Sequence, residues 1–155
     1  MRSPEGPRPE RLFTLFRDLV KIDSESGKER RVAEYITRFC AELGLDVCED
    51  SAGEATGGEC GNLVIRVPAA AFSTLPPIIL NAHLDTVAPG RGVIPVDSGD
   101  RFTSAGDTVL GADDKAGVAC ILAAVEFLMG SGLDHRAVDV VFTVQEEMGL
   151  QGAKH

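Results

Sequence analysis

Hydrophobic residues recur with the period of an α-helix in three stretches of the chain, where apolar side chains are spaced by three or four positions. The three predicted helices span residues 11–22, 32–43 and 115–129. Ser26 and Glu29 have the spacing of a capping box ahead of the second helix. Gly44 follows the last periodic residue of that helix, in the position of a left-handed C-cap.

Apolar runs that are too short for helices lie between these segments and predict strands. The predicted strands are residues 45–48, 62–67, 77–80, 93–96, 108–110 and 137–144. The last of them is a nearly continuous apolar run, of the kind that is buried in the middle of a sheet. Residues 1–10 are expected to form a flexible tail, and the glycine-rich segment 51–61 a loop. Strands that alternate with helices indicate an α/β layer fold.

Three short groups of ionisable residues each follow one of the predicted strands. The groups are His83-Leu84-Asp85 after 77–80, Asp113-Asp114-Lys115 after 108–110, and Glu146-Glu147 after 137–144. The carboxyl ends of parallel strands meet at one edge of a sheet, where open α/β sheets bind their ligands. We therefore expect one histidine and several carboxylates to converge at this edge and form a metal site.

His83 and Asp85 are two positions apart, so in an extended segment both side chains point to the same side. A neutral imidazole is a good ligand for Zn²⁺, and a neighbouring carboxylate can orient the ring. Taken alone, a pattern as short as His-x-Asp is more often a hydrogen-bonded core histidine near a surface aspartate.

The two pairs of adjacent acids also have ordinary structural explanations when each is taken alone. Aspartate at a helix N-terminus caps the helix and complements its dipole, which accounts for one of Asp113 and Asp114 better than for both. Because a carboxylate has two oxygens, one aspartate could instead bridge two cations. Of Glu146 and Glu147, one could bind metal while the other takes a proton from an attacking water. Their joint occurrence after three predicted strands favours the metal-dependent reading.

Composition excludes several other classes of function. The chain has 155 residues and a net charge of −9, which argues against nucleic acid or an anionic membrane as a partner. It contains no apolar run as long as a membrane span, and we expect no secretory signal at its start. Its four irregularly spaced cysteines are expected to be reduced thiols of a cytoplasmic protein. A calcium module built from Asp97, Asp100 and Asp107 is rejected, because their spacing does not fit an EF-hand loop.

The ionisable groups lie within three longer strings. These are residues 81–87 (NAHLDTV), 111–117 (GADDKAG) and 142–149 (FTVQEEMG). Together they resemble the signatures of the co-catalytic zinc exopeptidase superfamily, which includes peptidase T, glutamate carboxypeptidase and aminoacylase. Residues 55–63 (ATGGECGNL) are most similar to the peptidase T-like branch. The resemblance implies a three-layer α/β sandwich around a mostly parallel mixed sheet.

The resemblance also implies a role for five residues. His83 would ligate one metal, and Asp85 would clamp the imidazole ring. Asp113 would bridge two metals. Glu146 would be the general base, and Glu147 a further metal ligand.

The activity implied is that of a dinuclear Zn²⁺ hydrolase, in which Co²⁺ or Mn²⁺ could substitute for zinc. The expected function is a peptidase T-like exopeptidase that hydrolyses short peptides. An N-acyl amino acid deacylase of the same superfamily is the nearest alternative. In relatives the peptide bond after the bridging aspartate is cis, so a cis Asp113–Asp114 bond is expected.

Members of this superfamily are considerably longer, with a lid or dimerisation domain and further metal ligands. The resemblance therefore covers the N-terminal part of a catalytic domain, residues 11–155, and implies a homodimer for the full-length form. We expect the 155-residue chain alone to be inactive, and a catalytically incomplete fragment is the third alternative. Its sheet is expected to have an unpaired edge or an uncovered apolar face near residues 140–144.

Overall fold

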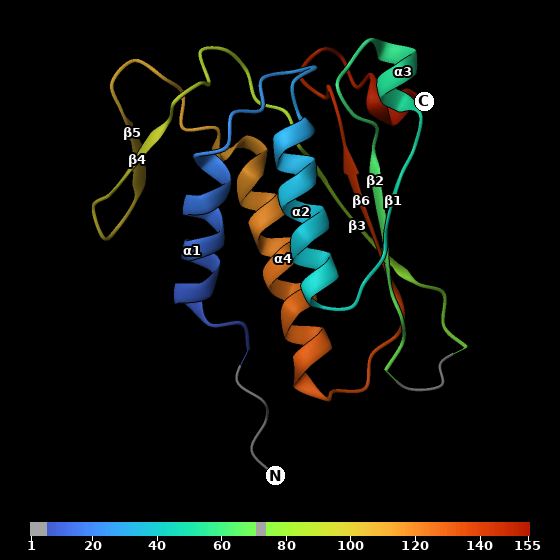
Figure 1. Ribbon diagram of the computed structural model, residues 1–155. Coiled ribbons are helices and arrows are strands. Elements are labelled where there is room, and N and C mark those ends of the chain that lie inside the picture. The colour runs from blue at the N-terminus through green and yellow to red at the C-terminus, as the bar shows by residue number, and fades with distance from the viewer. Residues whose placement is uncertain (1–5, 71–73) are drawn as a thin grey trace.

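A mixed four-stranded sheet and three long helices make up most of the structure (Figure 1). The computed structural model describes residues 6–70 and 74–155. The sheet has the order β1-β2-β6-β3, with bounds Val47–Glu49, Leu63–Val67, Val138–Thr143 and Ile78–His83 in that order. β1 and β2 are antiparallel, as are β2 and β6, whereas β3 and β6 are parallel. The predicted α/β fold with a mixed sheet is confirmed. Within the described residues one of the three strand pairings of this sheet is parallel, and the three long helices cover one face, so the expected third layer and mostly parallel pairing are not seen in this part.

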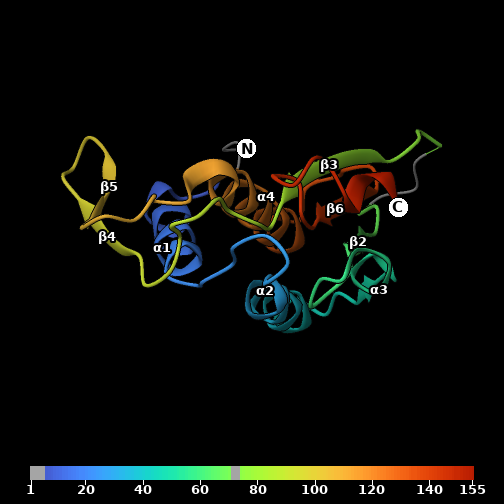
Figure 2. The same cartoon turned by 90° about the horizontal axis from the view of Figure 1, so that it is seen from above.

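The three long helices lie on the same face of the sheet, as the view from above makes plain (Figure 2). They are α1 (Pro9–Val20), α2 (Arg30–Glu42) and α4 (Ala112–Ser131). Their buried apolar side chains meet those of the sheet in one core, where Ile36, Leu122 and Phe142 are almost inaccessible to solvent. Fully burying a side chain of this size stabilises the fold by about 1.5–3 kcal/mol. None of the described helices is long and apolar enough to cross a membrane.

Buried and exposed side chains alternate along β2, which explains why the helices pack on only one face of the sheet. Leu63, Ile65 and Val67 are buried, while Val64 and Arg66 between them are exposed. Successive side chains of a strand point to opposite faces, so the buried set faces the helices. The other set faces away from them.

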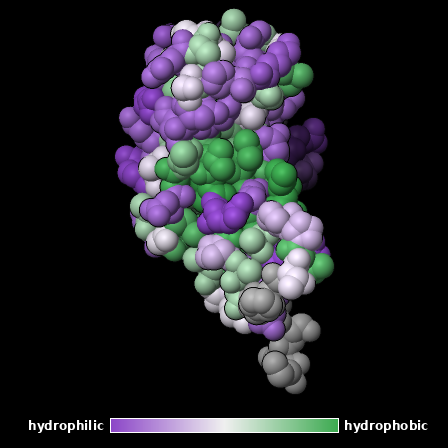
Figure 3. Space-filling view, turned by 90° about the vertical axis from the view of Figure 1, so that its right-hand side faces the viewer, coloured by the Kyte–Doolittle hydropathy of each residue, from purple (hydrophilic) through white to green (hydrophobic). Residues whose placement is uncertain are grey.

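The sheet face that points away from the helices carries apolar side chains without a covering layer in the described residues. Val64 is 40% exposed and Ile79 is 68% exposed, and Val141 is paired with Val64 in the ladder. An ion pair between Arg66 and Asp139 crosses the same face. Figure 3 shows apolar side chains gathered in the middle of this side of the molecule, around polar ones. The expected uncovered face therefore exists.

The residues of that face differ from those expected. Val140, Phe142 and Val144 are buried against the helices, and of the segment 140–144 Val141 belongs to the open face. A continuous apolar run cannot reveal which of its residues face the helices. The pairing of β6 with the alternating strand β2 settles it.

Two predicted elements were wrong, and one strand was not predicted. Residues 108–110 form no strand: they belong to a loop in which the Val109 amide donates to the Pro89 carbonyl. The strand of this region lies earlier, at β5 (Phe102–Ala105), which pairs with β4 (Ile94–Asp97) in a hairpin beside α1 (Figure 1). The predicted loop 51–61 contains a short helix, α3 (Ala52–Thr56). Short apolar runs do not reveal whether a partner strand is available, which explains both the wrong strand at 108–110 and the missing prediction of β5.

The chain begins its first helix at Pro9, two residues before the expected start, and residues 1–5 of the expected tail lie outside the described part. Helix α2 begins at Arg30, and neither Ser26 nor Glu29 caps it through its side chain. The capping-box prediction is therefore wrong. Both side chains make other buried contacts, described below.

Candidate metal centre

His83, Asp113 and Glu147 come together at the end of the molecule where β3 and β6 finish and α4 begins (Figure 1). Their ligand atoms all lie within 4.8 Å of one another. The expected convergence of the three groups is thus found in the structure. Among the described residues, this is the one group of histidine, cysteine and acidic side chains close enough to hold a metal ion.

The register of the parallel strands brings two of the three groups to the same level. His83 is paired with Thr143, and the Leu84 amide donates to the Thr143 carbonyl, so both strands end together. Gln145 then adopts a left-handed backbone conformation with φ of 51°, which turns the following residues back toward Asp85. The second group reaches the site from a loop, because residues 108–110 form no strand.

Asp113 and Asp114 lie in the first turn of α4 and have non-helical backbone angles. The regular helix continues from Lys115 onward, as the apolar stripe predicts. The Asp113–Asp114 peptide bond is cis, as expected. The Asp113 side chain is 85% exposed, with one carboxylate oxygen 3.1 Å from His83 Nε2. Asp114 Oδ1 accepts a hydrogen bond from the Gly117 amide. One aspartate therefore caps the helix while the other faces His83.

Asp85 connects the other parts of the site through its hydrogen bonds. It is completely buried, and its Oδ1 accepts a hydrogen bond of 2.8 Å from the Glu146 amide. Its Oδ2 accepts from the Glu147 amide at 3.1 Å and from the Ser26 hydroxyl at 2.6 Å. Burial by itself raises the pKa of Asp85, but hydrogen bonds, first of all from His83, bring that pKa below its usual value. Asp85 is therefore an anion that ties His83 to the segment carrying Glu146 and Glu147.

The two nitrogens of His83 have different surroundings. Nδ1 lies 2.9 Å from the Asp85 carbonyl oxygen and 3.3 Å from Asp85 Oδ1. Nε2 faces Asp113 and lies 3.9 Å from Glu146 Oε2. An imidazole whose Nδ1–H is bound by a backbone carbonyl or a carboxylate presents Nε2 as its metal-binding atom.

In the metal-free protein, His83 is expected to be protonated at neutral pH and to make stability depend on pH. Burial lowers its pKa, but Asp85 and Asp113 outweigh burial and raise the pKa from 6.5 to about 9. A raised folded-state pKa gives stability that is fully present below pH 6.5 and is lost as the pH rises through 9. Lys115, whose pKa burial lowers to about 8, acts in the opposite direction at higher pH.

The diagnostic window is therefore pH 6.5 to 8, the interval below the lowered pKa of Lys115. Urea unfolding of the metal-free protein should give a free energy of unfolding that falls across this window, and His83→Asn should remove the fall. An unchanged slope in His83→Asn would contradict the assignment.

The charges around the cluster suit a cation. In the part of the chain that the structure describes, no lysine or arginine forms an ion pair with Asp113, Glu146 or Glu147. The nearby Lys115 is buried and points away, donating to the carbonyl of Ile22. Carboxylate oxygens and an imidazole nitrogen are donors that Zn²⁺ accepts. The residues present therefore fit a divalent metal.

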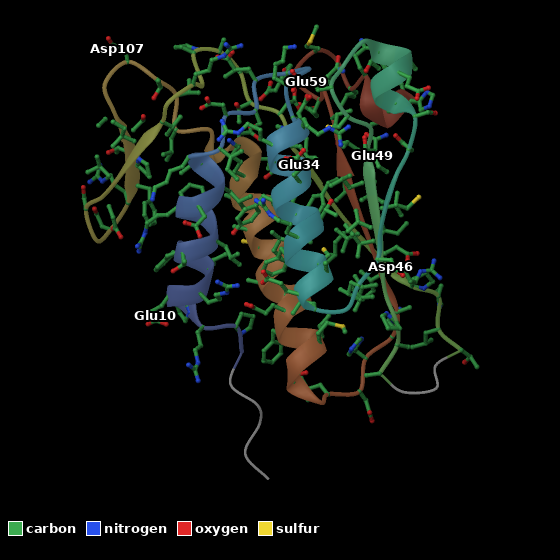
Figure 4. The ribbon with its side chains drawn as sticks, in the orientation of Figure 1. Glu10, Glu34, Asp46, Glu49, Glu59 and Asp107 are labelled. Carbon is green, nitrogen blue, oxygen red and sulfur yellow. The ribbon has the colours of Figure 1, made fainter. Side chains whose placement is uncertain are left out.

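Most of the other acidic side chains are spread over the surface, as the six labelled ones illustrate (Figure 4). Asp107 lies at the tip of the loop after β5, Asp97 is paired with Arg17, and Asp100 is paired with Arg101. These aspartates do not form a cluster among the described residues.

The sequence did not reveal the part that Ser26 and Glu29 play around the site. Ser26 donates to Asp85, and Glu29 accepts from the Gln145 amide at 3.1 Å. The only signal was their Ser-x-x-Glu spacing, which suits a helix cap equally well.

A mixed α/β sheet with this cluster at the ends of two parallel strands belongs to the zinc exopeptidase type of structure. Residues 62–155, which carry all three groups, match the profile of peptidase family M28. The chain belongs to this family, and membership implies a divalent metal. The expected kinship with peptidase T is confirmed by the relatives.

Three relatives illustrate how similar the chain is to known proteins. The uncharacterised protein YqjE of Bacillus subtilis is 39% identical over 93% of this chain and 38% of its own length. The crystal structure of a tripeptidase from Staphylococcus aureus has 37% identity and a TM-score of 0.90, covering 97% of this chain and 40% of that one. The structure of aminopeptidase PepT from Bacillus cereus has 38% identity and a TM-score of 0.90, covering 95% and 39%. The chain thus spans about two fifths of the length of these relatives.

Proposed function

We propose that this chain forms part of a metal-dependent exopeptidase that hydrolyses short peptides at a chain end, as a tripeptidase or peptidase T does. The observation that carries the proposal is the convergence of His83, Asp113 and Glu147, with Glu146 beside them. The likeness to a tripeptidase and an aminopeptidase at 37% and 38% identity supports the peptide as substrate class.

Each residue of the cluster has a role in this proposal. His83, through Nε2, and Glu147 would hold one metal each, and the exposed carboxylate of Asp113 would bridge the two. Two Zn²⁺ ions, or Co²⁺ or Mn²⁺ in their place, would polarise the scissile carbonyl and acidify the attacking water. Asp85 would fix the ring of His83 and the backbone of the Glu146-Glu147 segment.

Glu146 would act as the general base. Its carboxylate is half-buried and lies near His83 Nε2, while its backbone is fixed by Asp85. From this position it would take a proton from the attacking water and pass it to the leaving amine. The cytoplasmic location and the homodimeric full-length form stay predictions.

The proposal is tested by assaying the whole protein, loaded with Zn²⁺, on tripeptides and on N-acyl amino acids. We expect hydrolysis of the tripeptides, and Glu146→Gln should lower kcat by about 10²–10⁴-fold, the usual contribution of a general base, without changing the bound metal. Glu34→Gln, on the exposed side of α2, is the matched control and should retain activity. Preferential cleavage of N-acyl amino acids would favour the deacylase instead, and full activity of Glu146→Gln would contradict the assigned base.

A further inference from the structure

The loop between α1 and α2, residues 21–29, touches all three segments of the candidate metal centre, although none of its residues is a candidate ligand. We call it the bracing loop. It contacts residues 83–86 through Ser24 and Ser26, the start of α4 through Ile22, and residues 145–147 through Glu29. These three segments are far apart in the sequence, and the bracing loop joins them at one place.

The first contact fixes the segment after β3. The Thr86 amide donates to the Ser24 carbonyl at 2.9 Å, and Glu25 and Thr86 form a parallel β-bridge. The Ser26 hydroxyl donates to Asp85 Oδ2 at 2.6 Å. The bracing loop therefore pairs at one β-bridge with the residues that follow His83, and supplies one of the donors to Asp85.

The second contact fixes the start of α4. Lys115 is 1% exposed, and its Nζ donates to the Ile22 carbonyl. Burying an ammonium group without a carboxylate in contact is unfavourable. The hydrogen bond that partly offsets this cost links the start of α4, which carries Asp113, to the bracing loop.

The third contact is made by Glu29, which is completely buried. Its Oε1 accepts hydrogen bonds from the Gly27 amide at 2.8 Å and from the Gln145 amide at 3.1 Å. No lysine or arginine among the described residues pairs with this carboxylate, and its burial raises its pKa. Burying a carboxyl group whose hydrogen bonds come only from backbone amides is energetically unfavourable. In this protein the buried carboxyl group binds the amide of Gln145, the residue that precedes Glu146 and Glu147.

We propose that the bracing loop sets the relative positions of the three metal-binding segments, and that Ser26 and Glu29 are positioning residues of the metal centre. The inference rests on the proposed function, because the group being positioned is the proposed ligand set. Residues that support ligands without touching the metal typically change metal affinity by about 10–100-fold when they are replaced.

The test compares Glu29→Ala, Glu29→Gln and Glu25→Ala in the whole protein. Glu29→Gln retains a carbonyl oxygen that can accept from Gly27 and Gln145. Glu25 belongs to the same loop, but its side chain pairs with Gly90 and Arg91. Its bridge to Thr86 is made by backbone atoms that Glu25→Ala retains, so this variant is the matched control. Two quantities are measured for each variant: Zn²⁺ affinity by calorimetry, and amide hydrogen exchange at 145–147 in the metal-free protein.

We expect Glu29→Ala to bind Zn²⁺ about 10–100-fold more weakly and to exchange faster at 145–147. Glu29→Gln should recover most of the affinity, and Glu25→Ala should behave as the wild type in both measurements. If Glu29 only stabilises the fold, Glu29→Ala will have a lower melting temperature, but its Zn²⁺ affinity and its amide exchange at 145–147 will equal those of Glu25→Ala. That result would overturn the inference.

The outcomes separate this inference from the proposed function. If the wild type binds no divalent metal, the proposed function fails, and hydrogen exchange alone then decides whether the bracing loop holds residues 145–147. If the wild type binds metal and Glu29→Ala binds it equally well, the bracing role is wrong and the proposed function stands. Should Glu29→Ala not fold, Ser26→Ala takes its place, with weaker Zn²⁺ binding expected and unchanged binding counting against the inference.

Discussion

Asp85→Ala is expected to lower the free energy of unfolding of the metal-free protein by about 3–5 kcal/mol, the range found when one partner of a buried ion pair is removed. The carboxylate is completely buried and receives hydrogen bonds from Ser26 and from the amides of Glu146 and Glu147. Truncation leaves these donors unpaired, and a buried donor without a partner costs about 1–3 kcal/mol. It also removes the anion beside His83. Urea unfolding monitored by circular dichroism measures the loss.

Two variants make this prediction specific. Asp85→Asn retains the shape and one acceptor oxygen, so its loss should be smaller than that of the alanine variant. Asp100→Ala removes a carboxylate whose ion pair with Arg101 is exposed, and surface pairs contribute only about 0–1 kcal/mol. If Asp85→Ala lowers the free energy of unfolding as little as Asp100→Ala does, the hydrogen bonds of Asp85 do not hold the site together as proposed.

The sequence predicted most of the elements that carry the site, because their patterns are local. Helices α1 and α2 are amphipathic over several turns, and α4 is apolar over most of its length. The apolar runs of β3 and β6 lead directly into ionisable residues. The parallel pairing of β3 and β6 then places His83 and Glu147 at the same edge of the sheet. This is the part of the convergence that follows from alternation of strands and helices alone.

The position of Asp113 follows from contacts that no local pattern encodes. The sequence predicts that Asp113 follows a strand at residues 108–110, but those residues form a loop. The loop is held instead by a hydrogen bond from the Val109 amide to Pro89 and by the buried Lys115 under it. Asp113 thus reaches the cluster for a different reason from the one predicted.

Ser26 and Glu29 illustrate the same limit. A Ser-x-x-Glu pattern before a helix suits a capping box, but it does not specify the hydrogen-bond partners of the two side chains. Here Ser26 is 59 positions from its partner Asp85, and Glu29 is 116 positions from Gln145. Such long-range partners are decided by the packing of the loop against the sheet edge.

The chain of 155 residues by itself is expected to bind one divalent metal weakly and to show no measurable peptide hydrolysis. The described residues offer His83, Asp113 and Glu147 as side-chain ligands, with Glu146 reserved as the base. Each Zn²⁺ requires about four donors including water, so three side chains complete one site poorly and cannot complete two. Its relatives, in which this part makes up about two fifths of the chain, have additional polypeptide from which further ligands can come.

Calorimetric titration with Zn²⁺ measures the number and affinity of the sites, and a tripeptide assay at saturating Zn²⁺ measures turnover. Asp113→Ala should abolish the remaining binding, because it removes the ligand expected to bridge the two metal positions. Asp107→Ala, which removes an exposed carboxylate at a loop tip, should leave binding unchanged. Tight binding of two metals by this chain, or turnover that Glu146→Gln eliminates, would show that the three ligands suffice and that the argument from donor number is wrong.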